Sequence, residues 1–169
     1  MSHLVYLGLG SNLGDKSQNI LNAIRQLDML AGEVLRTSSF YVSEPWGYHS
    51  ANHYFNAVCE LLTDLSPLQL LDQCKDIERI AGRKPKSSPH YEDRPLDIDI
   101  LLFDDRVISS PRLQIPHPRL HLRAFVLLPL AELIPDFVVP LSGLSVTQMR
   151  DALPRLDDTH PLHDPITPL

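Results

Sequence analysis

The 169-residue sequence has only two cysteines, Cys59 and Cys74, and they do not lie at a metal-ligand spacing. Both fall within segments of regular apolar periodicity, so we expect buried thiols in a reducing compartment rather than a disulfide framework or a zinc site. The sequence also lacks a run of eighteen apolar residues and the basic and apolar regions of a secretory signal. We therefore expect a cytoplasmic protein with no membrane partner.

Basic charge is scarce as well, because 15 Lys and Arg stand against 21 Asp and Glu, giving a net charge of -6. Affinity for a phosphate backbone needs a basic surface, so this balance argues against a general nucleic-acid partner. The charge is unevenly spread: the stretch from Lys75 to Arg123 has a balance of +2, and the remainder has -8. A basic stretch in an acidic protein points to a local anionic ligand.

Hydrophobic periodicity predicts strands over residues 3–9, 33–43, 54–63 and 96–103, and a short strand over 107–109 paired with the preceding one. Helices are expected from the cap at Asp15 to Gly32, from Ser66-Pro67 to Gly82, over 118–134 on either side of Pro129, and over 147–153. The order βαββαβ favours an α+β, ferredoxin-like sandwich, with a mostly antiparallel sheet and helices on one face.

The length and the 43% hydrophobic content suffice for one domain, which we expect to span residues 1–153. Residues 154–169 contain four prolines and are expected to form a disordered tail. The stretch from Arg83 to Arg94 is polar, lacks periodicity and is broken by Pro85 and Pro89. We expect it to be a mobile loop.

Two aspartates alternate with apolar residues in the segment Leu96-Asp97-Ile98-Asp99-Ile100-Leu101. In a strand this spacing places both carboxylates on one face, with α-carbons about 6.6 Å apart. Aspartate is a poor strand former, and like charges on one face repel each other unless positive charge lies between them. Mg²⁺ takes one or two carboxylates and leaves its other positions to water and phosphate oxygens. The pair predicts a magnesium site, with a solvated strand face as the plain alternative.

The glycine-rich segment from Gly8 to Ser17 comes close to two phosphate-binding motifs and satisfies neither. A dinucleotide fingerprint has two residues between its second and third glycines, whereas Gly10 and Gly14 enclose three. A P-loop has lysine directly after the last glycine, where this chain has Asp15. We interpret the segment as a tight strand-to-helix turn that also forms a wall of a ligand pocket.

Basic residues gather on both sides of the aspartate pair. Arginine grips phosphate with two parallel hydrogen bonds and lysine acts as a point charge, so a basic cluster beside a metal site favours nucleotide binding. The cluster comprises Arg83, Lys84, Lys86 and Arg94 before the pair, and Arg112, His117, Arg119 and Arg123 after it.

A group of aromatic residues points to a second ligand. Trp46 and Tyr48 lie in a loop with proline and glycine, and Tyr54 and Asn56 share one face of a predicted strand. Aromatic rings with an amide beside them suit a flat heterocycle whose edge the amide reads. Core packing is the alternative for Tyr54.

Six segments, in this order, resemble the 6-hydroxymethyl-7,8-dihydropterin pyrophosphokinases, and the resemblance extends from Leu4 to about Leu144. They are Gly8–Gly14, Ser43–Gly47, Phe55–Val58, Glu78–Arg83, Asp93–Leu101 and Ile115–Leu120.

The resemblance implies transfer of pyrophosphate from the co-substrate ATP to the pterin hydroxymethyl group, with release of AMP, in folate biosynthesis. Asp97 and Asp99 would hold two Mg²⁺ ions, and Arg83 and Arg94 would be catalytic. The implied ATP-site residues are Lys75, Glu78, Arg83, Tyr91, Arg94, Ile100, Arg112, His117 and Arg123. The implied pterin-site residues are Ser43, Trp46, Tyr54, Asn56 and Phe125, with Asn56 bonding the ring edge and the Tyr54 and Phe125 rings clamping it.

Two other functions fit parts of the pattern. A two-metal nucleotidyl transferase or cyclase would use an Asp-x-Asp strand equally well, and it would release pyrophosphate rather than AMP. A non-catalytic ligand-binding module of ferredoxin-like fold would not turn over ATP. We expect a monomer whose partners are small molecules.

Overall fold

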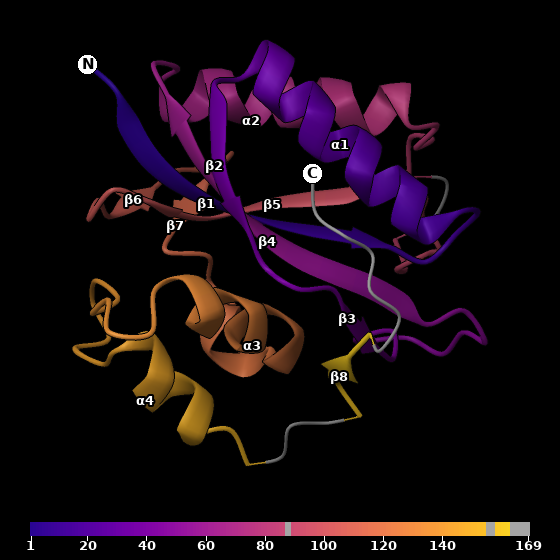
Figure 1. Ribbon diagram of the computed structural model, residues 1–169. Coiled ribbons are helices and arrows are strands. Elements are labelled where there is room, and N and C mark those ends of the chain that lie inside the picture. Colours follow the sequence, from indigo (N-terminus) through magenta and orange to yellow (C-terminus); the bar gives the residue numbers. More distant parts are fainter. Residues whose placement is uncertain (87–88, 155–157, 163–169) are drawn as a thin grey trace.

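An antiparallel sheet organises the chain, and the computed structural model describes residues 1–86, 89–154 and 158–162 (Figure 1). The sheet has the order β5-β1-β4-β3-β8, and β2 pairs with β4 beside β3. Its strands are β1 (His3–Ser11), β2 (Glu33–Thr37), β3 (Tyr41–Ser43), β4 (Tyr54–Thr63), β5 (Asp97–Phe103) and β8 (His160–Pro161).

Helices α1 (Lys16–Leu30) and α2 (Pro67–Ile80) start where the sequence provides caps. The side chains of Asp15 and Ser66 each accept the backbone N–H three residues later, which satisfies one of the free donors of the first turn. With these helices in place, the predicted βαββαβ order is confirmed, except that β2 and β3 together take the place of its second strand.

The apolar residues of the strands and of α1 and α2 meet in one core. Strand β1 contributes Val5, Leu7 and Leu9, which alternate along the strand as burial on one face requires. Cys59 of β4 and Cys74 of α2 are buried in the same core. Burial raises the pKa of both thiols, that of Cys59 to about 12.

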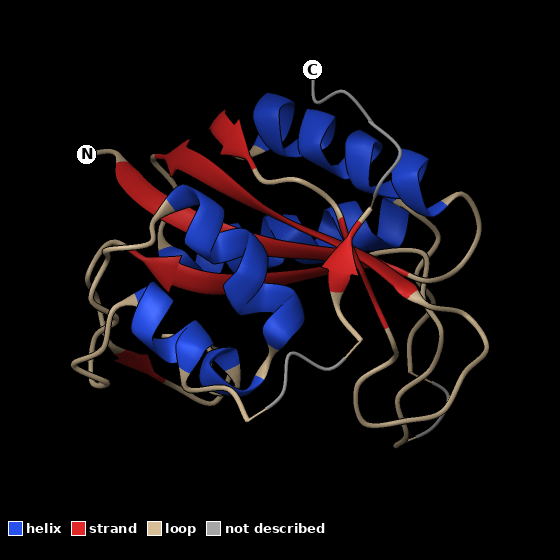
Figure 2. Ribbon diagram, turned by 60° about the horizontal axis from the view of Figure 1, so that its bottom comes forward, coloured by secondary structure: helices blue, strands red, loops and turns tan. Residues whose placement is uncertain are grey.

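A second set of helices covers the opposite face of the sheet (Figure 2). These are the short 3₁₀ turn η1 (Leu120–Leu122) and α3 (Ala124–Leu133), and α4 (Val146–Asp151) packs against α3. The prediction of helices on one face therefore holds for α1 and α2 but is incomplete. Helix α3 also continues through Pro129, where helical residues on either side had been expected. No helix in the described ranges has the length and apolar character needed to cross a bilayer.

The prediction of one strand over residues 33–43 is wrong, because the chain leaves the ladder at Ser38. The Ser38 hydroxyl accepts the backbone N–H of Val58 at 2.9 Å, and the Ser38 N–H donates to the Val58 carbonyl at 2.8 Å. A side chain thus takes a place that a backbone carbonyl holds in a regular ladder. The segment becomes two strands, β2 and β3.

One prediction about pairing is also wrong. Residues 107–109 do not pair with β5; instead β6 (Ile108–Ser109) pairs with β7 (Gln114–Ile115) in a separate small sheet. The expected disordered tail contains β8, which pairs with β3, and the N–H of Leu162 donates to the Phe40 carbonyl at 2.8 Å. Residues 155–157 and 163–169 of that tail lie outside the described part of the chain, as do residues 87 and 88 of the expected mobile loop.

Candidate active site

The floor of the site is the face of the sheet opposite α1 and α2. Strand β1 lies between β5 and β4, so Gly10 is paired with Asp97 on one side and Asn56 on the other. A Cβ on Gly10 would lie 3.4 Å from the Tyr54 ring and 3.5 Å from the Asn56 Oδ1. Glycine in a strand interior commonly marks a close approach of a ligand. Because Gly8 and Gly10 have no side chains, they leave space above the sheet between the aspartates of β5 and the Asn56 amide.

A pocket of about 600 Å³, part of it open to solvent, rises from this floor. It has a charged end at β5 and an aromatic end at β3 and β4. All five predicted pterin-site residues and five of the predicted ATP-site residues or metal ligands line it. These ten are Ser43, Trp46, Tyr54, Asn56 and Phe125, together with Tyr91, Arg94, Asp97, Asp99 and Arg123.

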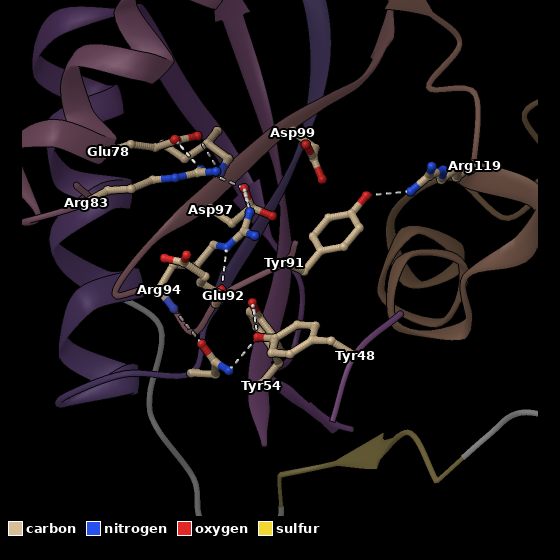
Figure 3. A network of polar contacts seen from close by, with 12 residues as sticks. Tyr48, Tyr54, Glu78, Arg83, Tyr91, Glu92, Arg94, Asp97, Asp99 and Arg119 are labelled. Atoms are coloured by element: carbon tan, nitrogen blue, oxygen red, sulfur yellow. Dashed lines mark hydrogen bonds and ion pairs between the residues drawn. The ribbon is translucent and has the colours of Figure 1, made fainter. Parts of the chain in front are cut away.

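At the charged end, two arginines from opposite ends of one loop converge on Asp97 (Figure 3). The Asp97 Oδ1 lies 2.9 Å from the Arg83 Nη1 and 3.4 Å from the Arg94 Nη1. Arg83 also pairs with the buried Glu78 of α2, whose second oxygen accepts the Ile98 N–H at 3.1 Å. Glu78 thus holds Arg83 beside the acid pair.

Asp99 has weaker compensation. Its carboxylate lies 3.6 Å from the Arg123 Nη1 and 3.9 Å from the His117 Nε2. Burial, reinforced by the charge of Asp97, raises the pKa of Asp99 to about 7, and burial raises the pKa of Glu78 to about 7 as well. Burial thus disfavours the charged forms of Asp99 and Glu78, even though Arg83, Arg94 and Arg123 form ion pairs with the acids at this end.

Mg²⁺ fits this donor set. No group of three or more His, Cys, Asp or Glu side chains suited to a metal occurs in the described ranges. Mg²⁺ does not require such a cage, since it binds through one or two carboxylates plus water and substrate phosphates. Asp97 and Asp99 offer hard oxygen ligands on one face, and a cation between them would relieve their mutual repulsion.

His117 is a neutral donor at this end of the pocket. Burial, with the nearby charge of Arg123, lowers its pKa to about 4. Its Nδ1 accepts the Arg119 backbone N–H at 3.1 Å, so in the neutral ring the proton is on Nε2, the atom nearest Asp99. His117 can therefore donate to an anionic oxygen without carrying a charge.

At the aromatic end, Asn56 is buried and fixed in orientation. Its Nδ2 donates to the Ser43 hydroxyl at 2.8 Å, which leaves Oδ1 to accept from a ligand. The neighbouring Tyr54 hydroxyl lies 3.1 Å from the Tyr48 hydroxyl. An amide of set direction beside an aromatic ring suits the polar edge of a flat heterocycle.

Arg123 lies where the two ends meet. Its guanidinium carbon is 4.9 Å from the centre of the Trp46 ring and 5.4 Å from that of Phe125. Its Nη1 faces Asp99, and its Nε is buried with no hydrogen-bond partner among the residues that the structure describes. An arginine that stacks on aromatic rings and still has a free donor can contact both a ring system and a phosphate.

Tyr91 closes one wall of the pocket from the loop between α2 and β5. Its ring stacks on Tyr48 with centroids 6.3 Å apart, and its hydroxyl accepts from the Arg119 Nη1 at 2.6 Å (Figure 3). The Arg94 guanidinium lies 5.7 Å from the centre of the same ring. Tyr91 thereby links the loop to both ends of the site.

Six predicted ATP-site residues do not line this pocket. Glu78, Arg83 and His117 lie beside the acid pair, whereas the other three lie farther away. Ile100 is buried in the core beneath α1 and α2. Lys75 is exposed on α2, and Arg112 forms an ion pair with Asp72 of the same helix. They lie on the α2 side of β5, so their part in binding ATP remains a prediction.

Sequence reasoning gave no role to Asn12, Asp93 or Glu44. Asn12 is fully buried, and its side chain contacts Asp93, while Glu44 lines the pocket beside Trp46. Both Asn12 and Asp93 fall inside the segments that carry the family resemblance. Their partners come from distant segments, so spacing along the chain gave no signal for them.

Comparison with known proteins agrees with the family resemblance of the sequence. The family described as 7,8-dihydro-6-hydroxymethylpterin-pyrophosphokinase matches residues 6–135. A 2-amino-4-hydroxy-6-hydroxymethyldihydropteridine pyrophosphokinase of Porphyromonas gingivalis is 43% identical over 134 residues, which are 78% of this chain and 91% of that protein. The folic acid synthesis protein FOL1 of Dictyostelium discoideum is 38% identical over 168 residues, which are 98% of this chain but 25% of that protein.

Among solved structures, the HPPK-DHPS triple mutant of Plasmodium falciparum with SDX-DHP superposes with a TM-score of 0.72 at 16% identity. The match covers 89% of this chain and 44% of the Plasmodium chain. At that identity the likeness shows the fold alone. The chain thus spans only a part of the Dictyostelium and Plasmodium proteins.

Proposed function

Because this chain belongs to the 7,8-dihydro-6-hydroxymethylpterin-pyrophosphokinase family, we propose that its glycine-floored pocket is where pyrophosphate passes from ATP to the pterin hydroxymethyl group. The chain is a pyrophosphokinase of folate synthesis, as its family is. One observation supports the pocket assignment above others: the acid pair Asp97 and Asp99 shares a single cavity with Tyr54, Asn56 and Phe125.

The charged end is the proposed site of the ATP phosphates. Asp97 and Asp99 would hold Mg²⁺, two ions according to the family resemblance, and the bound metal supplies positive charge to the phosphate oxygens. Arg83 and Arg94 already converge on Asp97 and present donors in a planar fork that matches phosphate. With phosphate present, they would stabilise the negative charge of the transferring group.

Other residues would extend the ATP site from this end. His117 and Arg123 lie on the Asp99 side and can donate to phosphate oxygens. Glu78 positions Arg83, and Tyr91 bounds the pocket. The exposed basic side chains Lys75 and Arg112, and the backbone near Ile100, would complete the nucleotide site on the α2 side of β5.

The aromatic end is the proposed pterin site. The Oδ1 of Asn56 would accept an N–H from the edge of the ring, and the rings of Tyr54 and Phe125 would contact its two faces. Ser43 fixes the amide, and Trp46 carries the stacked Arg123. This arrangement would direct the hydroxymethyl group toward the charged end.

In the proposed reaction the pterin hydroxyl oxygen attacks the β-phosphorus of ATP, the bond from that phosphorus to the α-phosphate oxygen breaks, and AMP leaves. Positioning and charge neutralisation supply most of the catalysis in phosphoryl transfer, so a strong protein base is not required. Glu78 lies outside the pocket lining and is engaged by Arg83 and the Ile98 N–H, which makes it a support for Arg83 rather than a base.

An assay for AMP tests this proposal. The enzyme with Mg²⁺ and ATP should release AMP when 6-hydroxymethyl-7,8-dihydropterin is added and should release almost none without it. Release of pyrophosphate in place of AMP would indicate a nucleotidyl transferase or cyclase. Binding of ATP with no turnover on any pterin would indicate a ligand-binding module. A cytoplasmic location and a monomeric state remain predictions, which fractionation and light scattering can check.

A further inference from the structure

The carboxylate of Asp93, next to Arg94 in the chain, accepts four hydrogen bonds. Its Oδ1 accepts from the Asn12 Nδ2 at 2.8 Å and from the Tyr48 hydroxyl at 3.1 Å. Its Oδ2 accepts from the Ser50 hydroxyl at 2.9 Å and from the Asn52 Nδ2 at 2.7 Å. All four donors are neutral, and three of them belong to the single loop between β3 and β4. This carboxylate therefore organises a loop rather than pairing with a cation.

The same contacts fix the backbone of Arg94. The Arg94 N–H donates to the Asn12 Oδ1 at 2.8 Å, and the Asn12 N–H donates to the Arg94 carbonyl at 3.1 Å. Asn12 is fully buried, so its amide cannot exchange these partners for water. Asn12 thus joins the glycine-rich turn to the residue that carries a predicted catalytic guanidinium.

Two short paths lead from Asp93 to the two ends of the pocket. Along one, the Tyr48 hydroxyl lies between Asp93 and the Tyr54 hydroxyl, 3.1 Å from each. Along the other, the peptide from Asp93 to Arg94 leads to the guanidinium beside Asp97. The two paths meet at the Asp93 residue, one through its carboxylate and one through its peptide bond.

We propose that Asp93 is a positioning residue that couples the pterin end of the pocket to Arg94 at the phosphate end. The proposal rests on the proposed function of the pocket. A ligand seated against Tyr54 stabilises Tyr48 and its loop, and through Asp93 it stabilises the backbone that aims Arg94. The phosphate end becomes fully formed when the pterin end is filled. By linkage, each ligand must then raise the affinity for the other by the same factor.

Asp93→Ala removes all four hydrogen bonds and provides the main test. We measure the affinity for a non-hydrolysable ATP analogue with Mg²⁺, with and without saturating pterin, and the turnover with ATP. Hydrogen bonds to a charged group justify an expected loss of about tenfold in both turnover and the coupling factor. Affinity for the analogue alone should stay within about twofold, since the Asp93 carboxylate forms hydrogen bonds with neutral donors and, in the described part of the chain, no ion pair with the basic residues around Asp97.

Asp105→Ala is the matched control, because it removes an exposed aspartate from the turn after β5. It should leave turnover and the coupling factor unchanged. If Asp93→Ala does not fold, as judged by circular dichroism, Asp93→Asn replaces it. That variant keeps the shape but has one acceptor oxygen, so it should lose part of the coupling. A folded Asp93 variant with wild-type turnover and coupling would overturn the proposal.

Tyr48→Phe distinguishes coupling from general stabilisation, because it deletes only the hydroxyl and keeps the ring beside Tyr91. It should lower the coupling factor in the wild type and add little in the Asp93→Ala background, since both changes break the same path. Additive losses would overturn the path through Tyr48. The wild-type AMP assay separates the two proposals. If the wild type releases no AMP, the proposed function is rejected. If the wild type releases AMP and Asp93→Ala is unaffected, only the coupling is rejected.

Discussion

On one face of β1, Val5, Leu7 and Leu9 are at most 2% exposed and pack beneath α1 and α2, whereas on the other face Gly8 and Gly10 form the floor of the pocket. Strand β5 repeats the contrast, with isoleucines toward the helices and Asp97 and Asp99 toward the pocket. Alternate residues of the same strands thus serve stability and chemistry. Substitutions on the two faces should therefore separate these properties.

The largest effect is expected from Asp97→Ala and Asp99→Ala on the pocket face. Each deletes a proposed metal ligand, and turnover should fall by about a thousandfold. The free energy of unfolding should stay the same or rise in Asp99→Ala, because that change removes a like-charge repulsion. In Asp97→Ala the loss of the ion pairs with Arg83 and Arg94 offsets that relief, so its free energy of unfolding should be the lower of the two. The rate of AMP release measures turnover, and denaturant unfolding measures the free energy of unfolding. Full activity with Mg²⁺ in either variant would contradict the metal assignment.

Leu7→Ala on the opposite face should produce the converse result. Leu7 is fully buried, so its truncation should lower the free energy of unfolding by about 2–5 kcal/mol. The KM values of the protein that remains folded should change little, since Leu7 does not line the pocket. Urea unfolding and steady-state kinetics at low temperature provide the measurements. A change in KM as large as that of a pocket-face variant would show that the two faces are not separable.

Asn56→Ala sharpens the contrast between the two ends of the pocket face. The loss of the amide should weaken pterin binding by about 1–3 kcal/mol, because it leaves the polar ring edge without its partner. Affinity for the ATP analogue should change by less than about twofold. Titration calorimetry with each ligand separately measures both values, and Ser43→Ala, which only loosens the amide, should give a smaller loss. Equal losses for the two ligands would remove Asn56 from the pterin site.

The smallest effect concerns a polar cluster further along the pocket-side face. Glu60 accepts from the Tyr6 hydroxyl at 2.5 Å and from the Arg36 Nη2 at 2.6 Å, and the Arg36 contact lowers the pKa of Glu60. Glu60→Gln should cost about 1 kcal/mol of stability at neutral pH, since Arg36 is partly exposed.

The stability from Glu60 depends on pH in a defined direction. Its folded pKa is lowered, so its contribution is full above the unfolded carboxyl pKa of about 4.3 and is lost as pH falls through the folded value. Thermal unfolding of the wild type and of Glu60→Gln should therefore differ at pH 7 and converge in acid. A difference that persists at low pH would assign the effect to packing.

Local signals predicted the main elements well. The caps at Asp15 and Ser66 marked helix starts, and alternation on β5 marked both a strand and an acid pair. Long-range pairing was not readable in the same way. Prolines near the C-terminus predicted disorder, but β8 lies at the edge of the sheet, where Pro161 need not donate to a further strand.

The residues of the site likewise divide into those with a local sequence signal and those that depend on long-range contacts. Asp97 and Asp99 stood out because two carboxylates on one strand face conflict with local preference. Asp93 did not stand out in the sequence, because the donors to its carboxylate come from the turn at Asn12 and from the loop of Tyr48, Ser50 and Asn52. Only the folded chain brings these segments together. A short strand was predicted where β6 lies, but its partner β7 was missed because a strand of two residues is too short to show a period.

The two buried thiols can report how often the core opens. Thiolate is the reactive form, and Cys59 and Cys74 are at most 1% exposed with pKa values raised by burial. An alkylating reagent should therefore reach them only when the core between α2 and the sheet opens, so the alkylation rate reports that opening. Because both native thiols react slowly, a cysteine introduced at an exposed position such as Asp105 would be the one fast-reacting thiol. It could carry a spectroscopic label without removal of either native cysteine.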